Sequence, residues 1–370
     1  MRILLDYRPA LRERTGVGEY VHQLAAALAR RLSPDDRLTL VSSSWRDRLA
    51  PDLVAGASVV DLRIPVRVLN AAWHRLGAPA VERLAGEADV AHSPSPLLMP
   101  SSRAAQVVTI HDLDFLDHPE RTRAEIRRDY PSLAPRHVPR ADHVIAVSGH
   151  TAGEVERRLG VSRDRISVCS PGAPGWTARA EPMPDGPILF MGTLEPRKNV
   201  GLLIDAYARL RSRFPAAPKL LLAGRAAEGA DAWLRKIAEA PLRGHVEHIG
   251  YVAADRRYAL YCASSMVVLP SHTEGFGLPA LEAMTAGVPI VVTRAGALPE
   301  VVGDAGFVVE RDDAEAMTAA MHAILTDAAR TAQAVERGVQ RARRYSWDAS
   351  AALLLDAYRQ AMERRRSKAR

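Results

Sequence analysis

The sequence predicts an α/β protein of two domains, each with a doubly wound parallel sheet. The length of 370 residues suffices for two ordinary cores. Short apolar runs alternate with helical segments along most of the chain, which is the pattern of βαβ units. A stretch rich in Pro and Gly begins at Pro171 and is the clearest linker. We therefore expect a first domain at 1–172, a linker at 173–187, a second domain at 188–345 and a closing segment at 346–370.

The first half holds a series of expected strands, the apolar runs at 2–5, 38–41, 59–62, 90–92, 107–110, 141–148 and 166–168. A helix is expected from about Glu19 to Arg31, and Thr151 with Glu154 is typical of a capping box for a later helix. Gly16 and Gly18 lie between the first strand and the first helix, where glycines can present backbone NH groups to an anion. A tight turn without a ligand explains them equally well.

The segment 63–84 mixes apolar and basic residues and allows two interpretations. Its members alternate between the two kinds: Val68, Leu69, Trp73 and Leu76 among Arg67, His74, Arg75 and Arg83. One interpretation is an amphipathic helix packed on the core, and the other is a surface for a lipid-linked or membrane-bound acceptor. The arginines between 121 and 140 likewise fit either an anionic acceptor or a solvated helix face.

The second half repeats the alternation of strands and helices. Strands are expected at 188–191, 220–223, 246–249, 266–269 and 289–293, and helices at 200–214, 314–325 and 349–364. Gly287 should end the helix of the 267–293 stretch, because glycine suits the left-handed position past a helix end. The residues from Arg364 to Arg370 are expected to form a frayed, solvated tail.

The stretch 267–293 is expected to form strand, Gly-rich loop, helix and strand, and it contains two carboxylates. Glu274 lies where the first strand gives way to the loop, and ligands bind at this edge of open parallel sheets. Gly275 and Gly277 let the backbone approach a ligand closely, and a carboxylate accepts hydrogen bonds from vicinal hydroxyls. Glu282 follows about two helical turns later, so both acids can face one ligand. Taken singly, each acid also fits a helix cap or a solvated surface position.

Further polar residues follow other strands. Arg197 and Lys198 stand between a strand end and a helix start, where guanidinium, ammonium and helix dipole all suit a diphosphate. An ordinary exposed basic turn is the alternative. His111 follows the strand at 107–110 and is either a ligand-facing or a packed structural histidine. Asp112 and Asp114 could form a metal pair, but this chain offers basic residues for phosphates, so we expect no metal site.

Composition narrows the classes of function. The formal charge of +7 and the pI of about 9.7 indicate an anionic partner, which fits a nucleotide, a nucleic acid or a membrane surface. Aromatic residues make up 5% of the chain and no nucleic-acid motif occurs, so we expect no nucleic-acid partner. The sequence has neither a bilayer-spanning apolar run nor a signal peptide, and Cys169 and Cys262 fit buried thiols. These features predict a cytoplasmic protein.

Together these motifs resemble the retaining glycosyltransferases of family 4, which have the GT-B fold of two Rossmann-like domains facing a cleft. The resemblance covers nearly the whole chain and is strongest over 188–306. It implies an acceptor-side N-terminal domain, a donor-binding C-terminal domain and a last helix that crosses back to the first domain.

For the donor, the resemblance implies that Glu274 contacts hydroxyls of the transferred sugar and that Glu282 binds the ribose. The backbone at Phe276, Gly277 and Leu278 supports the same sugar.

Arg197 and Lys198 match residues that bind the diphosphate, although Thr193 stands where some members carry arginine. Gly250 and Tyr251 lie in a loop near the nucleobase.

In the first domain, Gly16 and Gly18 match the glycine loop beside donor phosphate and acceptor. His111 matches a histidine near the transferred sugar.

The resemblance thus implies a hexosyltransferase that moves a sugar, with retention, from a nucleotide-diphosphate sugar to a glycan, lipid-linked or small-molecule acceptor. The donor is a co-substrate, and no cofactor is expected. The stretches 192–199 and 111–116 look most like bacterial mannosyltransferases of polysaccharide assembly, which leans towards GDP-mannose. A nucleotide-sugar epimerase or a phosphorylase on the same fold stays open, as does peripheral contact with an anionic membrane at its inner face.

Overall fold

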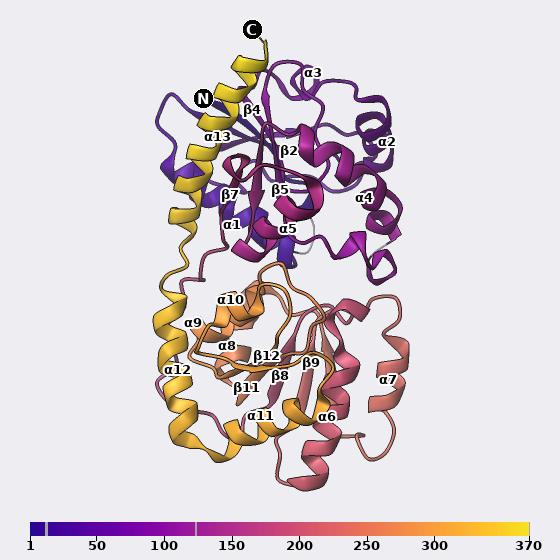
Figure 1. The fold of residues 1–370 in the computed structure, drawn as a ribbon, viewed down its shortest axis with the longest axis vertical. Helices are drawn as coiled ribbons and strands as arrows, with labels where there is room; N and C mark the ends of the chain where they lie inside the picture. Colours follow the sequence, from indigo (N-terminus) through magenta and orange to yellow (C-terminus); the bar gives the residue numbers. More distant parts are fainter. Residues whose placement is uncertain (12–13, 123, 370) are drawn as a thin grey trace. The chain divides into compact units, whose positions relative to one another are not determined.

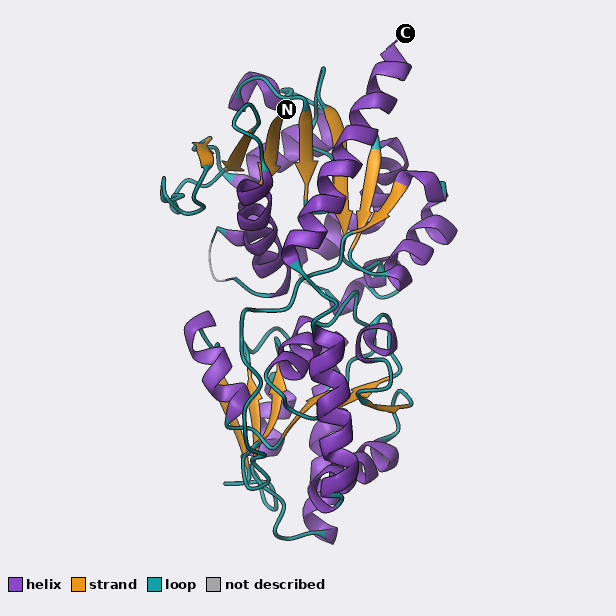
Figure 2. Cartoon of the chain, turned by 90° about the vertical axis from the view of Figure 1, so that its left-hand side faces the viewer, coloured by secondary structure: helices purple, strands orange, loops and turns teal. Residues whose placement is uncertain are grey.

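The computed structural model describes residues 1–11, 14–122 and 124–369. They form two compact units, one from Met1 to Gly172 together with the C-terminal segment from Ser346, the other from Ala173 to Tyr345. Each unit has a parallel sheet flanked by helices (Figures 1 and 2). The predicted class, two doubly wound parallel sheets, is confirmed.

Within the described ranges, the first unit contains a sheet of seven parallel strands in the order β3-β2-β1-β4-β5-β6-β7. The strands are β1 (Arg2–Asp6), β2 (Arg37–Ser42), β3 (Ala57–Asp61), β4 (Val90–Ser93), β5 (Ala105–Ile110), β6 (His143–Ala146) and β7 (Ile166–Val168). The inner strands are buried along their whole apolar length, as expected where helices cover both faces of a parallel sheet.

The helices of this unit are α1 (Gly16–Arg31), α2 (Val66–Ala71), α3 (Val81–Ala85), α4 (Ala124–His137), α5 (Gly149–Leu159) and α13 (Trp347–Ala369). A π-helical turn, Ala72–Leu76, continues α2. α13, the yellow helix of the first unit in Figure 1, packs against α1 and β5.

Three local expectations for this unit are corrected. Helix α1 begins at Gly16, so Gly16 and Gly18 form its first turn rather than a loop before it. The cap of α5 is Ser148, whose side chain accepts the Thr151 N–H, so Thr151 lies inside the helix and is not its cap.

The expected frayed tail is helical to Ala369, while Arg370 lies outside the described residues. The Lys368 ammonium bonds the buried Asp142 carboxylate at 2.8 Å, and Arg364 donates to His143 Nδ1 at 2.8 Å. These contacts join the end of α13 to the start of β6 and therefore hold the helix end in place.

Within the described part of the chain, the second unit contains six parallel strands in the order β10-β9-β8-β11-β12-β13. They are β8 (Ile188–Met191), β9 (Leu220–Ala223), β10 (Val246–Gly250), β11 (Met266–Leu269), β12 (Ile290–Thr293) and β13 (Phe307–Val309). The helices are α6 (Val200–Arg213), α7 (Asp231–Ile237), α8 (Ala254–Cys262), α9 (Leu278–Thr285), α10 (Leu298–Val302), α11 (Ala314–Thr326) and α12 (Ala328–Ala342). This strand order is typical of dinucleotide-binding folds.

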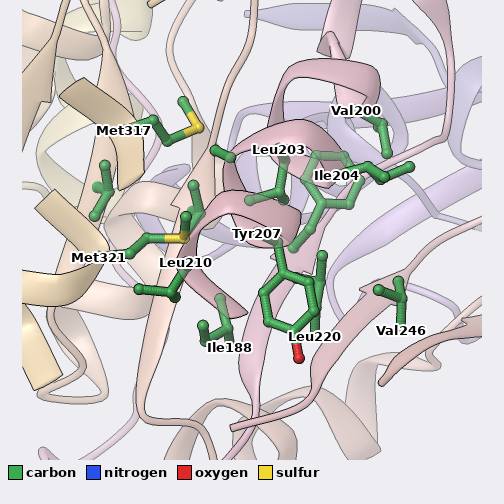
Figure 3. Packing of buried hydrophobic residues seen from close by; sticks show 14 of the residues in the cluster. Ile188, Val200, Leu203, Ile204, Tyr207, Leu210, Leu220, Val246, Met317 and Met321 are labelled. Atoms are coloured by element: carbon green, nitrogen blue, oxygen red, sulfur yellow. The ribbon is translucent and has the colours of Figure 1, made fainter. Parts of the chain in front are cut away.

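The core of the second unit lies where α6 and α11 pack together on the sheet (Figure 3). Tyr207 and Leu210 of α6 meet Met317 and Met321 of α11, and all four are fully buried. The Tyr207 hydroxyl is satisfied by the Pro218 carbonyl at 2.9 Å, so a polar tip costs this core little. The cluster fixes α6, whose first turn follows the predicted diphosphate-binding residues.

Both cysteines are free thiols, with Cys169 buried and Cys262 half-buried. Among the described residues, no helix has the length and apolarity needed to cross a membrane.

Buried histidines make the first unit sensitive to acid. His92 is fully buried between the Tyr358 hydroxyl and Thr109 Oγ1, both 2.7 Å from its ring nitrogens. Burial, with a smaller contribution from His111, lowers the pKa of His92 to about 3. Below the ordinary histidine pKa the unfolded chain therefore binds a proton that the folded chain does not, so stability falls as the pH falls.

We predict that His92→Gln weakens this pH dependence. As the pH falls from about 7 to about 5, a histidine that stays neutral in the folded protein lowers the free energy of unfolding by about 2 kcal/mol, because the same histidine gains a proton in the unfolded chain. Urea unfolding at both pH values should show that the wild type loses about this much more than the variant. An equal loss in both proteins would contradict the assignment.

Candidate functional site

The candidate site of the second unit lies where its strand order reverses. β8 pairs with β9 on one side and with β11 on the other, so the chain leaves the sheet in opposite directions from this point. In open parallel sheets, ligands bind beyond the carboxyl ends of the strands at such a point. The loops after β8 and β11 therefore share one edge of the sheet.

Glu274 is held at this edge by its own loop. Pro270 ends β11 because proline has no N–H for the ladder. Ser271 then donates its hydroxyl to Glu274 Oε1 at 2.7 Å, and the Thr293 hydroxyl donates to the Ser271 carbonyl at 2.6 Å. Glu274 is only 6% exposed, so its carboxylate has a fixed position rather than a solvated one.

The structure brings Lys198 and Glu274 together. The Lys198 ammonium lies 2.6 Å from Glu274 Oε1, although 76 residues separate them. Burial alone would raise the pKa of Glu274, but the charges of Lys198 and Arg197 and the bonds to Lys198 and Ser271 outweigh it. The net effect is a lowered pKa, so Glu274 is an ionised acceptor of hydrogen bonds at neutral pH.

Arg197 lies beside this pair in a single helical turn, Pro196–Lys198. Its guanidinium bonds Glu195 Oε1 at 3.1 Å, and its carbonyl accepts the His272 N–H at 2.9 Å. Asn199 then adopts a left-handed conformation and begins α6. Two cations therefore stand directly before a helix N-terminus, a favourable arrangement for an anion.

Glu282 belongs to a second set of contacts. It lies on α9, whose residues 280–285 are all buried, so its carboxylate needs partners. The Tyr261 hydroxyl donates to Glu282 Oε2 at 2.7 Å, and Arg257 reaches Oε1 at 3.4 Å. Burial, with Glu282 next, raises the pKa of Tyr261 well above its usual value, so this hydroxyl keeps its proton and donates. Trp176 packs on Tyr261 with ring centroids 5.6 Å apart.

The turn between Glu274 and α9 requires glycine. Gly277 has a φ of +98°, and a Cβ there would lie 2.6 Å from Leu298 Cδ2. Leu278 starts the helix, with Pro279 in its first turn. The Phe276 ring is buried against Tyr345 at 5.3 Å, so Phe276 can offer a ligand its backbone rather than its ring.

Gly250 and Tyr251 lie at the carboxyl end of β10, two strands away from β8. The Gly250 carbonyl accepts the Gly224 N–H at 2.7 Å, which joins the loops after β9 and β10. The Arg225 guanidinium lies over the Tyr251 ring at 5.8 Å. Planar groups are therefore gathered at this flank of the sheet edge.

The remaining predicted residues, Gly16, Gly18 and His111, belong to the first unit. Gly18 packs against the loop after β1, where a Cβ would come within 2.7 Å of the Pro9 carbonyl oxygen. His111 follows β5 and meets Tyr20 edge-on at 5.1 Å. Gly18 and His111 therefore pack within their unit, whereas a Cβ at Gly16 would meet open space. The roles of all three residues toward a ligand stay predictions.

The structure adds four residues that sequence reasoning missed: Ser271, Tyr261, Arg257 and Gly296. Gly296 lets the Glu274 backbone pass, since a Cβ there would lie 2.1 Å from the Glu274 carbonyl oxygen. Ser271 stands three residues before Glu274, and a serine at this short spacing often forms a local hydrogen bond, so the sequence could have indicated it. Arg257 and Tyr261 gave no such signal, because only the tertiary fold places α8 beside α9.

The aspartates 112 and 114 do not form a metal cluster in the part of the chain that the structure describes, where no group of three or more metal-binding side chains occurs. Asp112 Oδ1 instead accepts the Asp114 N–H at 3.2 Å. This contact is a local turn.

We predict that Gly277→Ala destabilises the second unit by about 1–2 kcal/mol, because a left-handed φ is costly for any residue with a Cβ. Gly153→Ala is the matched control: Gly153 lies inside α5 with open space around it. This control should stabilise the protein by about 0.5–1 kcal/mol, and urea unfolding measures both effects. Equal effects of the two substitutions would show that the turn does not need glycine.

Comparison with known proteins identifies the family. A model of glycosyl transferases group 1 matches residues 186–327, and a model of glycosyltransferase family 4 matches residues 14–174. O-antigen chain mannosyltransferase B of Escherichia coli is 32% identical over 289 residues, which cover 72% of this chain and 73% of that protein.

A D-inositol 3-phosphate glycosyltransferase of Salinispora tropica is 32% identical over 258 residues, 62% of this chain and about half (53%) of its own length. The solved structure of a sucrose-phosphate synthase from Thermosynechococcus elongatus superposes with a TM-score of 0.78 at 23% identity, covering 97% of this chain and 98% of that one. That likeness shows the GT-B fold. The chain belongs to the family 4 glycosyltransferases.

Proposed function

We propose that this protein is a retaining glycosyltransferase that moves a sugar from a nucleotide-diphosphate donor to an acceptor hydroxyl. The observation that carries the proposal is the contact of Lys198 with Glu274 at the strand-order reversal of the second unit. It joins a cation suited to phosphate and a carboxylate suited to sugar hydroxyls, the two recognition elements that a sugar diphosphate requires.

Arg197, Lys198 and the start of α6 are proposed to hold the diphosphate. As the bond between the anomeric carbon and the phosphate oxygen breaks, negative charge grows on the leaving diphosphate. Cations and helix amides that are already in position stabilise that charge without rearrangement. This stabilisation is the main chemical contribution we assign to these residues.

Glu274 is proposed to bind the hydroxyls of the transferred sugar, with the backbone at Phe276, Gly277 and Leu278 beside it. In the retaining step that we propose, the acceptor oxygen attacks the anomeric carbon on the face that the leaving group departs from. The leaving phosphate oxygen takes the acceptor proton, so no protein nucleophile is needed. Engagement of Glu274 Oε1 by both Lys198 and Ser271 favours a binding role over a nucleophilic one.

The remaining donor and acceptor contacts are assigned by the same proposal. Glu282 would bind the ribose, and Gly250 with Tyr251 would border the nucleobase. His111 keeps its proposed role toward the transferred sugar. Gly16 and Gly18 keep theirs near phosphate and acceptor.

Mannose is the first sugar to test, because one relative is named a mannosyltransferase. GDP-mannose is the first donor to test, because the stretches 192–199 and 111–116 resemble those of mannosyltransferases. The acceptor would be a glycan, a lipid-linked molecule or a small molecule, and the reaction would need no metal or cofactor. We place the protein in the cytoplasm or at the inner face of an anionic membrane, which the two free thiols and the charge of +7 support.

The donor proposal predicts a selective thermal shift with one nucleotide-diphosphate sugar among GDP-, UDP-, ADP- and dTDP-sugars. A ligand at about 100 times its dissociation constant adds roughly 2.7 kcal/mol of stability. Arg197→Ala and Lys198→Ala should each weaken binding of the free nucleoside diphosphate by about 1.5–3 kcal/mol. Arg209→Ala and Lys236→Ala are matched controls, because these exposed cations also pair with carboxylates in the second unit.

Unchanged affinity in both site variants, measured by calorimetry on folded protein, would refute the diphosphate assignment. NMR of the donor alone and with acceptors then separates the reaction classes. A sugar altered without any acceptor would indicate an epimerase, whereas transfer that keeps the anomeric configuration supports the proposal.

Substitution of the two carboxylates should affect donor binding in different ways. Glu282→Gln and Tyr261→Phe should weaken nucleoside diphosphate binding, by about 1.5–3 kcal/mol for Glu282, yet leave binding of inorganic pyrophosphate intact, because pyrophosphate has no ribose. Glu274→Gln should keep affinity for the bare nucleotide and lose the additional affinity for the sugar. Tyr207→Phe is the control, since its hydroxyl serves backbone carbonyls. Equal losses of bare-nucleotide affinity in both carboxylate variants would defeat this division.

A further inference from the structure

We propose that the outward face of α2 and its π-helical turn is a docking surface for an anionic lipid bilayer. This α2 face consists of Arg67, Val68, Ala71, Ala72, Arg75 and Leu76. It belongs to the first unit and contains none of the residues assigned to the donor, so the inference does not depend on which sugar is transferred.

The opposite side of the same helix is firmly attached to the unit. Leu69 and Trp73 are each only 2% exposed and form part of a buried cluster. Asn70 accepts a hydrogen bond from the Arg8 guanidinium at 2.7 Å, and Arg8 also lies over the Trp73 ring at 5.1 Å. One side of the helix is therefore attached to the unit, and the other side is exposed.

That solvent side is apolar where an ordinary surface helix would be polar. Val68 is 58% exposed and Leu76 is 78% exposed, while Val66 at the helix start is 36% exposed. The six residues of the α2 face line a shallow, open depression of the surface. The core-packing interpretation of this segment thus holds for its inner side, while its outer side exposes aliphatic groups, the observation on which the proposal rests.

Charge on the α2 face selects an anionic partner. Arg67 and Arg75 of this face are exposed, and Arg63 is exposed shortly before the helix. The face itself contains no acid. The nearby Asp129 already bonds Arg128 at 2.6 Å, and this bond, with a smaller contribution from Arg75, lowers the pKa of Asp129. The local charge balance therefore stays positive. The aliphatic groups suit the boundary between lipid headgroups and acyl chains, and the neighbouring arginines suit anionic headgroups.

A second copy of this chain is a poorer occupant. A two-fold contact through the α2 face would set its arginines against those of the partner, which repel one another. A stable interface also buries about 800 Å² per partner, more than a face of six side chains from two short turns can supply. An anionic bilayer instead attracts the arginines of the face and accepts its few aliphatic side chains without needing a large complementary protein surface.

The test is flotation of the full chain with vesicles of phosphatidylcholine alone and of phosphatidylcholine mixed with phosphatidylglycerol. The wild type should partition to the mixed vesicles and lose that binding as salt rises. The double variant Val68→Asp/Leu76→Asp should weaken partitioning by roughly tenfold or more. Arg67→Gln and Arg75→Gln should each weaken it about fivefold and reduce the salt dependence.

Leu353→Asp and Arg31→Gln are the matched controls. Leu353 is a half-exposed aliphatic residue of α13, and Arg31 is an exposed arginine at the end of α1, both in the same unit. They should bind vesicles like the wild type, and every variant should keep the wild-type melting temperature and nucleoside diphosphate affinity. Equal binding of the wild type to both vesicle types, or undiminished binding by the α2-face variants, would overturn the proposal. A wild-type dimer that these variants dissociate, without vesicle binding, would assign the face to a second copy instead.

Discussion

The adjacency of β8 and β11 is the constraint on which the candidate site depends. It places the loop that carries Lys198 beside the loop that carries Glu274, although the two residues are far apart along the chain. Lysine holds the carboxylate ionised despite its burial, and the carboxylate in turn fixes the ammonium at the sheet edge. A buried ion pair of this kind is costly to form and contributes position more than stability.

A second layer of contacts orients the groups that we assign to the ligand. Tyr261 and Arg257 bring α8 onto the carboxylate of Glu282, which would otherwise be a buried charge on an apolar helix. Ser271 likewise orients the Glu274 carboxylate by donating a hydrogen bond to it. Both carboxylates are therefore held in place by protein groups, and a carboxylate fixed in this way needs little reorganisation to bind a ligand.

In the first unit, the C-terminal helix is attached through polar contacts in its middle and near its C-terminal end. His92 bonds Tyr358 inside the core, and Asp142 bonds Lys368 at the sheet edge. Arg364 and Lys368 of the basic C-terminal end are thus engaged in contacts with the body of the unit.

The fold class and the positions of nearly all strands could be predicted from the sequence, because they depend on local periodicity. The two carboxylates and the basic pair could be singled out as candidates, because they stand in compact motifs. The sequence also indicated the family, through residues contiguous in the 267–293 stretch. It placed the start of α1 late and mistook Thr151 for a cap, since helix ends depend on single side-chain contacts. It also took the basic C-terminus for a frayed tail.

Contacts between residues far apart in the chain became visible with the folded structure. That Lys198 touches Glu274, that Tyr261 supports Glu282 and that Leu69 is buried while Val68 is exposed all follow from how strands pair and helices pack. Strand order cannot be predicted from composition or periodicity. In a helix that mixes apolar and basic residues, the sequence also does not indicate which side faces the core. Contacts between residues far apart in sequence are set by the sheet, so they could be read only once the sheet was known.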